Sequence, residues 1–242
     1  MTDYEVISEY VMTSKTYKIK NNFNDPLYMN DNRFNYYLKI LACQFSNVVP
    51  NVETTLLTNG DKIADPGIYD ITELVTNYNQ YNNGTITINS NIGKLILSNT
   101  TASNITITTD NFLTSKFGGF SNITLPYTLA PGASLTAANT PIIQDYNFFV
   151  LACGNVTGYT YTSIEGSPFL PCNTIYTFPS NIAAFHIRNW TAIQALEFKL
   201  DSQVLNYLEF EIKDGLQRTL NIVPGAQSDF SITCQVIKKK RL

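Results

Sequence analysis

The feature that most constrains the fold is an alternation of apolar and polar residues with a period of two. The clearest example lies near the C-terminus, where Leu208, Phe210 and Ile212 alternate with Glu209 and Glu211. Successive side chains of a β-strand point to opposite faces of the sheet, so this pattern predicts a strand buried on one face.

Similar segments recur along the chain. The other stretches that predict strands are residues 36–48, 85–89, 94–98, 104–109, 147–156 and 230–237. In the C-terminal third, the turn dipeptide Asp214–Gly215 and the breaker at 224–229 divide the chain into three consecutive antiparallel strands, the middle one at 216–223. Many short strands separated by turn signals predict an all-β sandwich or barrel.

One segment, residues 69–81, predicts an amphipathic helix. Its apolar side chains recur at i, i+3, i+4 and i+7, namely Ile71, Leu74, Val75 and Tyr78. Asp70 precedes Glu73 by three residues, a capping-box spacing that satisfies two free N–H groups at the helix start. Residues 112–120 predict either a second helical turn or a loop that ends at Gly118–Gly119.

No linker or shift in composition divides the chain. We therefore expect one domain over residues 34–242, with a long surface excursion at 126–141 and another long loop at 157–181. The first 33 residues are rich in Asn and Asp, and we expect them to form an N-terminal arm that becomes ordered only on a partner.

Charged residues are scarce. Asp, Glu, Lys and Arg make up 14% of the chain, against about 25% in typical soluble domains. A surface of amides and hydroxyls suits a subunit packed against others, although an A/T-rich genome would enrich Asn and Tyr equally well.

The net charge of −3 gives no chain-wide basic field for nucleic acid. No apolar run has membrane-spanning length, and the first residues are acidic and polar, unlike a signal peptide. We therefore expect the protein to be made and assembled inside a cell.

The four cysteines predict reduced and mostly buried thiols. Cys43, Cys153 and Cys234 lie in strand-like segments, and none of the four forms a CxxC pair or has a histidine nearby for zinc. A disulfide between Cys153 and Cys172 is the alternative.

Candidate catalytic residues are few. The single histidine, His186, has no partners in its own segment for acid–base or metal chemistry, and β-sandwich enzymes of the cupin type need several metal-binding histidines. Glu197, Glu209 and Glu211 fall on outward strand faces, where we expect solvent as their partner, although Glu209 and Glu211 could form an acid pair. No nucleotide-binding or hydrolase motif is present. We therefore predict no enzyme activity, no metal and no cofactor.

The one dense run of charge is Lys238, Lys239, Lys240 and Arg241. One interpretation is a flexible basic tail that contacts nucleic acid or an acidic patch on a neighbouring subunit. The other is that the charges keep the end of the last strand soluble and block its edge pairing. Four charges alone bind DNA weakly at physiological salt. The single tryptophan, Trp190, is expected in the core or at an interface.

Three segments together carry a resemblance to a known family: DPGIYDITELVTNYNQ followed by TITI, then NFLTSKFGGF, then LNYLEFEIKDGLQRTLNIVPGAQSDFSITCQVI. Their order resembles the single jelly-roll capsid proteins, penton and minor, of virophages, Polinton-type elements and related large DNA viruses. The resemblance covers residues 34–237 and departs from the family at Pro224–Gly225, where a plainer loop is expected.

The resemblance implies a jelly roll of eight main strands in two four-stranded sheets, with one short inserted helix and long loops. It implies a virion structural protein, a penton-type subunit that forms homopentamers at the five-fold vertices of an icosahedral capsid. It also implies a double-jelly-roll major capsid protein as partner. The alternatives are a minor (cement) protein under the major capsid lattice and a jelly-roll head that binds a receptor or glycan, for which the Tyr-rich loop at 158–169 offers stacking surfaces.

Overall fold

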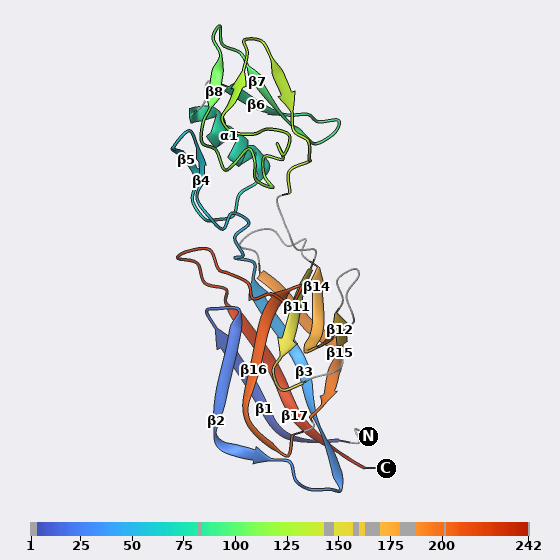
Figure 1. The fold of residues 1–242 in the computed structure, drawn as a ribbon. Coiled ribbons are helices and arrows are strands. Elements are labelled where there is room, and N and C mark those ends of the chain that lie inside the picture. Colours follow the sequence, from blue (N-terminus) through green and yellow to red (C-terminus); the bar gives the residue numbers. More distant parts are fainter. Residues whose placement is uncertain are drawn as a thin grey trace. The chain divides into compact units, whose positions relative to one another are not determined.

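The computed structural model describes residues 4–81, 84–142, 148–156, 160–162, 170–179, 187–200 and 202–241. The chain divides into two compact units, one of residues 1–48 and 146–242 and the other of residues 49–145. We call the first the sandwich and the second the inserted unit, because it falls between two successive sandwich strands in the chain (Figure 1).

Two four-stranded antiparallel sheets make up the sandwich. Sheet 1 has the order β1 (Tyr4–Ser14), β17 (Phe230–Lys240), β3 (Phe34–Ser46) and β15 (Ile187–Lys199). Sheet 2 has the order β14 (Thr174–Pro179), β11 (Phe148–Cys153), β16 (Val204–Asp214) and β2 (Lys18–Tyr28). The short strands β12 (Thr160–Thr162) and β13 (Leu170–Cys172) pair with each other.

The order in which the chain visits the two sheets defines the topology. Strands β1, β2, β3, β11, β14, β15, β16 and β17 lie in sheets 1, 2, 1, 2, 2, 1, 2 and 1. The last strand therefore inserts between the first and the third, and two interlocked Greek keys result, which is the jelly-roll arrangement. The prediction of an all-β, eight-stranded jelly-roll sandwich is confirmed.

The alternating pattern places the core between the sheets. Leu208, Phe210 and Ile212 of β16 are fully buried on its inner face. From sheet 1, Phe45 packs edge-on against two rings of sheet 2, with its ring centroid 5.4 Å from that of Phe149 and 5.2 Å from that of Phe178. This aromatic cluster joins the two sheets at the end of the sandwich where β3 and β14 end and β11 begins.

The prediction that residues 1–33 form an arm that becomes ordered only on a partner differs from what the structure shows. Residues 4–14 and 18–28 form β1 and β2, which pair with β17 and β16 and supply two of the eight strands. Both strands are sheet edges, so most of their side chains are exposed and few apolar residues are needed. Their polar composition reflects this edge position rather than disorder.

The expected single domain over residues 34–242 is revised as well. The strands predicted at 85–89, 94–98 and 104–109 belong to the inserted unit and not to the sandwich. The chain enters that unit through Val48 and Val49, which are buried and apolar. Because the junction lacks the composition of a linker, the sequence does not reveal it.

Seven short strands and one helix form the described part of the inserted unit. Its elements are β4 (Leu56–Thr58), β5 (Asp61–Ala64), α1 (Ile71–Tyr81), β6 (Gly84–Ile88), β7 (Leu95–Asn99), β8 (Ile105–Ile107), β9 (Tyr127–Leu129) and β10 (Ser134–Thr136). They pair as β10-β7-β6, β4-β5 and β8-β9. The stretch 126–141, expected as a surface excursion, thus supplies two paired strands.

The predicted helix is confirmed, with its capping box. The backbone N–H of Asp70 donates to Glu73 Oε2 at 2.8 Å, and that of Glu73 donates to Asp70 Oδ1 at 2.8 Å. Leu74, Val75 and Tyr78 are buried. These apolar side chains fix the helix in the core of the inserted unit.

Residues 112–120 form turns, not a second helix. Phe112 and Phe120 are fully buried in the core of the inserted unit. A Cβ at Gly118 would clash with the carbonyl oxygen of Leu113, and Gly119 has φ of +72°. Only glycine fits this close return of the backbone.

The prediction of a strand at 216–223 is wrong. That segment forms only an isolated bridge between Lys213 and Thr219, so two strands and not three close the fold. The Asp214 carboxylate accepts hydrogen bonds from the backbone N–H groups of Leu216 and Arg218, at 2.9 and 2.8 Å, and holds the chain in a turn. The segment after it carries the chain from sheet 2 to sheet 1.

Candidate functional site

The four basic residues predicted as a partner or genome contact lie in or next to a sheet. Lys239 pairs with Tyr4 of β1, and Lys240 pairs with Phe34 of β3. The backbone N–H of Arg241 donates to the carbonyl oxygen of Arg33 at 2.9 Å. The interpretations as a flexible tail and as a block to edge pairing are therefore wrong for these residues, since β17 is an inner strand.

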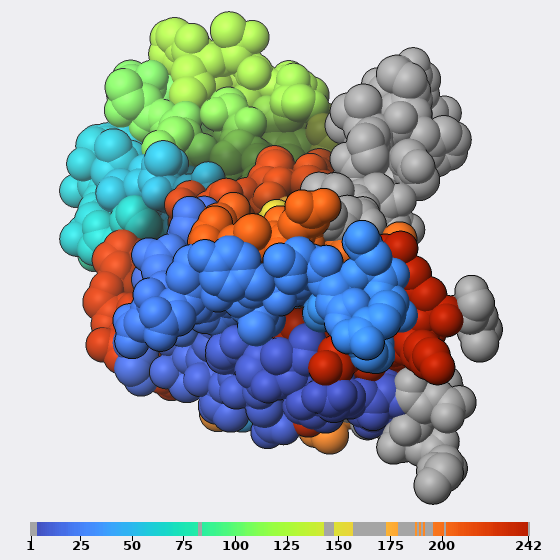
Figure 2. All heavy atoms as spheres, turned by 90° about the horizontal axis from the view of Figure 1, so that it is seen from below, coloured from blue at the N-terminus to red at the C-terminus, as the bar shows by residue number. Residues whose placement is uncertain are grey.

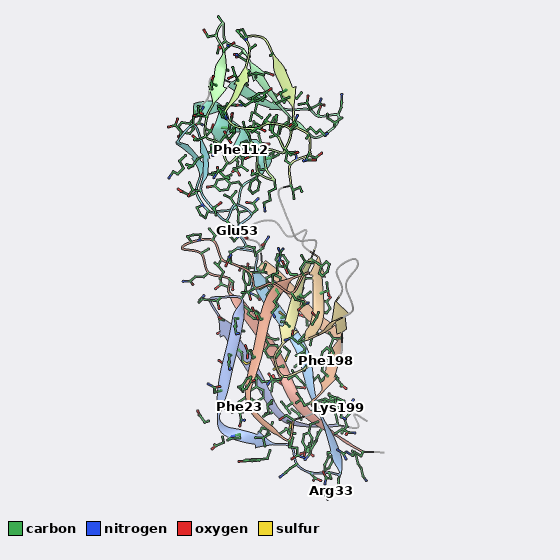
Figure 3. The ribbon with its side chains drawn as sticks, in the orientation of Figure 1. Phe23, Arg33, Glu53, Phe112, Phe198 and Lys199 are labelled. Atoms are coloured by element: carbon green, nitrogen blue, oxygen red, sulfur yellow. The ribbon has the colours of Figure 1, made fainter. Side chains whose placement is uncertain are left out.

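Other cations join this run at the same end of the sandwich, where β17 ends and β3 begins. We call it the basic end and define it by Arg33, Lys199, Lys238, Lys239, Lys240 and Arg241. Figure 2 shows atoms of the start of β3 (blue) and of the end of β17 (red) side by side, as their pairing requires. Figure 3 places Arg33 at the tip that precedes β3.

Two of the four terminal cations are neutralised within the chain. Lys238 Nζ lies 3.1 Å from a carboxylate oxygen of Glu5 and 4.9 Å from the ring centroid of Phe34. Lys239 Nζ lies 2.5 Å from a carboxylate oxygen of Glu197, and this contact raises the pKa of the lysine. Glu197 is thus bound by an ammonium group, not solvent alone.

Arg33 is also neutralised. Its guanidinium makes a two-pronged contact with the Asp31 carboxylate, with N···O distances of 2.7 and 3.0 Å. This pair lowers the pKa of Asp31 to about 2. The guanidinium carbon lies 5.7 Å from the ring centroid of Phe34, which therefore contacts two cations.

Lys240 and Arg241 differ from these residues. Within the described part of the chain, neither side chain forms an ion pair with a carboxylate. Arg241 Nε donates to the amide oxygen of Asn35 at 3.1 Å, which holds the guanidinium in place without neutralising it. Lys240 is exposed at the end of β17.

A pocket of about 150 Å³ opens beside Arg241. Residues from three segments line it: 29–32 with 34–36, 199–200 with 202–203, and Arg241. Backbone hydrogen bonds from Met29 to Gln203 (2.7 Å) and from Leu200 to Tyr36 (2.9 Å) tie the first two segments together. Its polar lining includes Lys199, Asn30, Asn32, Asn35, Ser202, Gln203 and the arginine-bound Asp31.

Glu209 and Glu211, considered above as a possible acid pair, instead form salt bridges with lysines on the outer face of sheet 2, and we call this set the salt-bridge ladder. Lys18 Nζ lies 2.6 Å and Lys20 Nζ 3.7 Å from the carboxylate oxygens of Glu209, and the hydrogen bond to Lys18 lowers the pKa of Glu209. Lys213 Nζ lies 3.6 Å from Glu211. The expectation of solvent as their partner is wrong, and a Glu209 carboxylate whose pKa is lowered by a lysine is poorly suited to acid catalysis.

Three of the cysteines are buried free thiols. Burial raises the pKa of Cys153 and Cys234 to about 12 and raises that of Cys43 further. The prediction of reduced, buried thiols is confirmed for these residues, and Cys153 is not in a disulfide. The side chain of Cys172 lies outside the described residues.

His186, the side chain of Trp190 and most of the loop at 157–181 also lie outside the described residues. In the part that is described, no three His, Cys, Asp or Glu side chains gather as a set of metal ligands. None of the described helices has the length and apolar character to cross a membrane.

The sequence analysis did not predict that Lys199 and residues 29–36 lie next to the C-terminal cations at the basic end. The signal present is the run Asn30 to Asn35, which contains three asparagines and one arginine directly before a strong strand. Its link to Arg241 depends on pairing across more than 200 residues of sequence, which no local pattern encodes.

The sandwich defines the chain as a jelly-roll protein. Models of known protein families give no match to it, and neither do curated proteins. Among solved structures, it is similar to the mavirus penton protein, with 11% identity, a TM-score of 0.47 and coverage of 98% of this chain and 99% of that one. It is also similar to a chain in the cryo-electron microscopy structure of the Sputnik virophage, with 12% identity, a TM-score of 0.45 and coverage of 96% and 97%.

Proposed function

We propose that this chain is a penton-type capsid subunit that occupies the five-fold vertices of an icosahedral virus particle. The observation that carries the proposal is the strand order of the sandwich, β1-β17-β3-β15 over β14-β11-β16-β2. It is the pair of four-stranded sheets that the resemblance to single jelly-roll capsid proteins implies. A single jelly roll fits a vertex subunit, because the major capsid proteins of that lineage carry two.

The physical properties of the sandwich suit a shell subunit. Its core is closed between two sheets and joined by the aromatic cluster around Phe45, so the body is rigid. Few charges oppose the approach of neighbouring copies, since only 14% of residues are charged. A ring of identical subunits uses two different surfaces of each copy and closes by rotation.

The partners in this proposal are other copies of the chain, as a homopentamer, and a double-jelly-roll major capsid protein around the vertex. The protein then resides in the virion and acts as a structural component without catalysis. The salt-bridge ladder around Glu209 supports this role, because it stabilises the outer face of a sheet and forms no reactive centre.

The size of the purified full-length protein tests the proposal. Light scattering coupled to size exclusion should give a closed ring with five times the 27.1 kDa mass of one chain. Co-expression with the major capsid protein should place the chain at the vertices of assembled particles in a cryo-electron microscopy map.

Two results would lead to another function. Density beneath the lattice instead of at the vertices would assign the chain as a cement protein. A stable monomer that binds glycans on an array and does not join particles would assign it as a receptor-binding head.

A further inference from the structure

One carboxylate of the inserted unit lies in its interior. Asp110 is only 7% exposed and forms an isolated β-bridge with Thr58 of β4. It therefore lies where β4 is joined to the turns of residues 111–120. The other described Asp and Glu residues of this unit are exposed, namely Glu53, Asp61, Asp65, Asp70 and Glu73.

The two carboxylate oxygens of Asp110 have different surroundings. Oδ1 accepts a hydrogen bond of 2.7 Å from the backbone N–H of Leu113. Oδ2 is buried and has no hydrogen-bond partner among the described residues. An ionised oxygen in this position loses its hydration without replacement, which costs free energy. A proton on Oδ2 removes this cost and leaves Oδ1 free to accept from Leu113.

The side chains around Asp110 are buried and favour its neutral form. Thr58, Tyr78 and Phe112 are fully buried, and the ring centroids of Tyr78 and Phe112 are 5.5 Å apart in the interior of the unit (Figure 3). Burial raises the pKa of Asp110 and outweighs the hydrogen bonds from Leu113, Thr58 and Phe112, which act in the opposite direction. Burial and then the negative charge of Asp110 raise the pKa of Tyr78, so these two titratable groups are neighbours.

The charged side chains of the neighbouring elements have other partners or lie in solvent. On β5, Lys62 pairs with the exposed Asp65 at 2.8 Å. In the turns, the ammonium of Lys116 lies 5.0 Å from the centroid of an aromatic ring of its own segment. The carboxylates of α1 lie at its exposed first turn. Burial and hydrogen bonds, not a described charged neighbour, therefore shift the pKa of Asp110.

We propose that Asp110 is a proton-controlled latch between β4 and the turns of residues 111–120, which is firm when Oδ2 is protonated and weak when the carboxylate is ionised. Opening of the bridge to Thr58 lets water reach the carboxylate, so ionisation favours the open form. The inserted unit is thus more stable in mild acid than at neutral pH. This latch concerns the inserted unit alone and does not depend on the capsid role.

The sign of the pH dependence follows from the pKa of Asp110 in the two states. In the folded unit it is raised above about 3.9, the value for an unfolded chain. The folded unit therefore binds the proton more tightly. The resulting stability is complete below the unfolded pKa and is lost as the pH rises through the folded pKa. Glu209 of the sandwich has the opposite sign, because its pKa is lowered.

Amide hydrogen exchange of the full chain at about pH 4.5 and about pH 7.5 tests the latch, with each rate corrected for the intrinsic exchange rate at that pH. The amides of Asn59, Asn111 and Leu113 link β4, the residues around Asp110 and the turns. Their protection should be about tenfold higher at the lower pH. The amides of β16 in the sandwich should gain no protection there.

Two variants with the same loss of charge assign the effect. D110N keeps an acceptor for Leu113 and removes the charge, so its protection should vary little with pH and should match the wild type in acid. D70N neutralises an exposed carboxylate of the same unit and should keep the wild-type pH dependence. Wild-type protection that is equal at both pH values, or higher at neutral pH, would overturn the latch. A pH dependence in D110N as large as in the wild type would also overturn it.

A further variant decides the question if D110N fails to fold. T58V has nearly the same shape but lacks the hydroxyl that favours the ionised form of Asp110. In a series of pH values, the midpoint at which protection is lost should therefore move to higher pH in T58V. A midpoint that stays in place or moves to lower pH would contradict the latch.

Discussion

Lys18 and Glu209 form an ion pair on the outer face of sheet 2, with 2.6 Å between Nζ and Oε1, and they join the edge strand β2 to β16. The pair lowers the pKa of Glu209 and raises that of Lys18. A lowered carboxylate pKa contributes stability above the pKa of the unfolded chain, and this contribution disappears as the pH falls through the folded-state pKa. The raised lysine pKa keeps the contribution until strongly alkaline pH.

We therefore expect K18Q to lower the free energy of unfolding by about 0.5 kcal/mol at pH 7, the value for an exposed pair. The difference from wild type should vanish at acid pH, below the folded-state pKa of Glu209. Urea unfolding at both pH values measures this. K20Q serves as the matched control, because Lys20 Nζ lies 3.7 Å from the same carboxylate. An effect of K20Q as large as that of K18Q would contradict the assignment.

The packing of Phe45 against both sheets makes a second prediction. Phe45 is fully buried and contacts the rings of Phe149 and Phe178. F45A removes this contact and leaves a cavity, so we expect the sandwich to lose about 3–5 kcal/mol of stability. V11A, at a side chain that is 70% exposed in the same sheet, should change stability by less than about 0.5 kcal/mol. Chemical denaturation followed by aromatic fluorescence compares the two variants.

A third prediction concerns the capping box of α1. The backbone N–H groups of Asp70 and Glu73 each donate to the other residue's carboxylate at 2.8 Å. D70A removes one acceptor, and we expect the inserted unit to lose about 1 kcal/mol of stability, whereas D70N should retain most of it. Hydrogen exchange of the amides in residues 71–81 measures the effect within that unit. Equal protection in D70A and wild type would show that the cap does not limit helix opening.

The sequence predicts those features that depend on local periodicity. In β16, Phe210 and Ile212 alternate with Glu209 and Glu211, and the structure buries the first pair and exposes the second pair to lysines. The start of α1 follows from the spacing of Asp70. Such features need only the geometry of one strand or one helix turn.

Features that depend on distant pairing were not predictable in this way. Strand β2 reads as disordered because Asn21 and Asn22 follow its lysines, yet its pairing with β16 makes it a sheet edge. The basic end depends on Lys240 lying opposite Phe34, far away in the sequence. The boundary of the inserted unit is hidden because apolar strands lie on both sides of it.

The last prediction follows from the buried thiols. Cys43, Cys153 and Cys234 are free and buried, and burial raises the pKa of all three. The thiolate is the reactive form, so at pH 8 these residues combine a very small thiolate fraction with a barrier to reagent access. In C172S, which leaves only these three cysteines, we expect no fast reaction with a disulfide reagent such as DTNB. The same variant in concentrated urea should react at all three thiols, and this serves as the control.

A thiol between two closed sheets reacts only when the sandwich opens. The slow rate of thiol reaction in native buffer should therefore fall when pentamers form and should rise in F45A. Fast reaction of native C172S would contradict the burial of these cysteines.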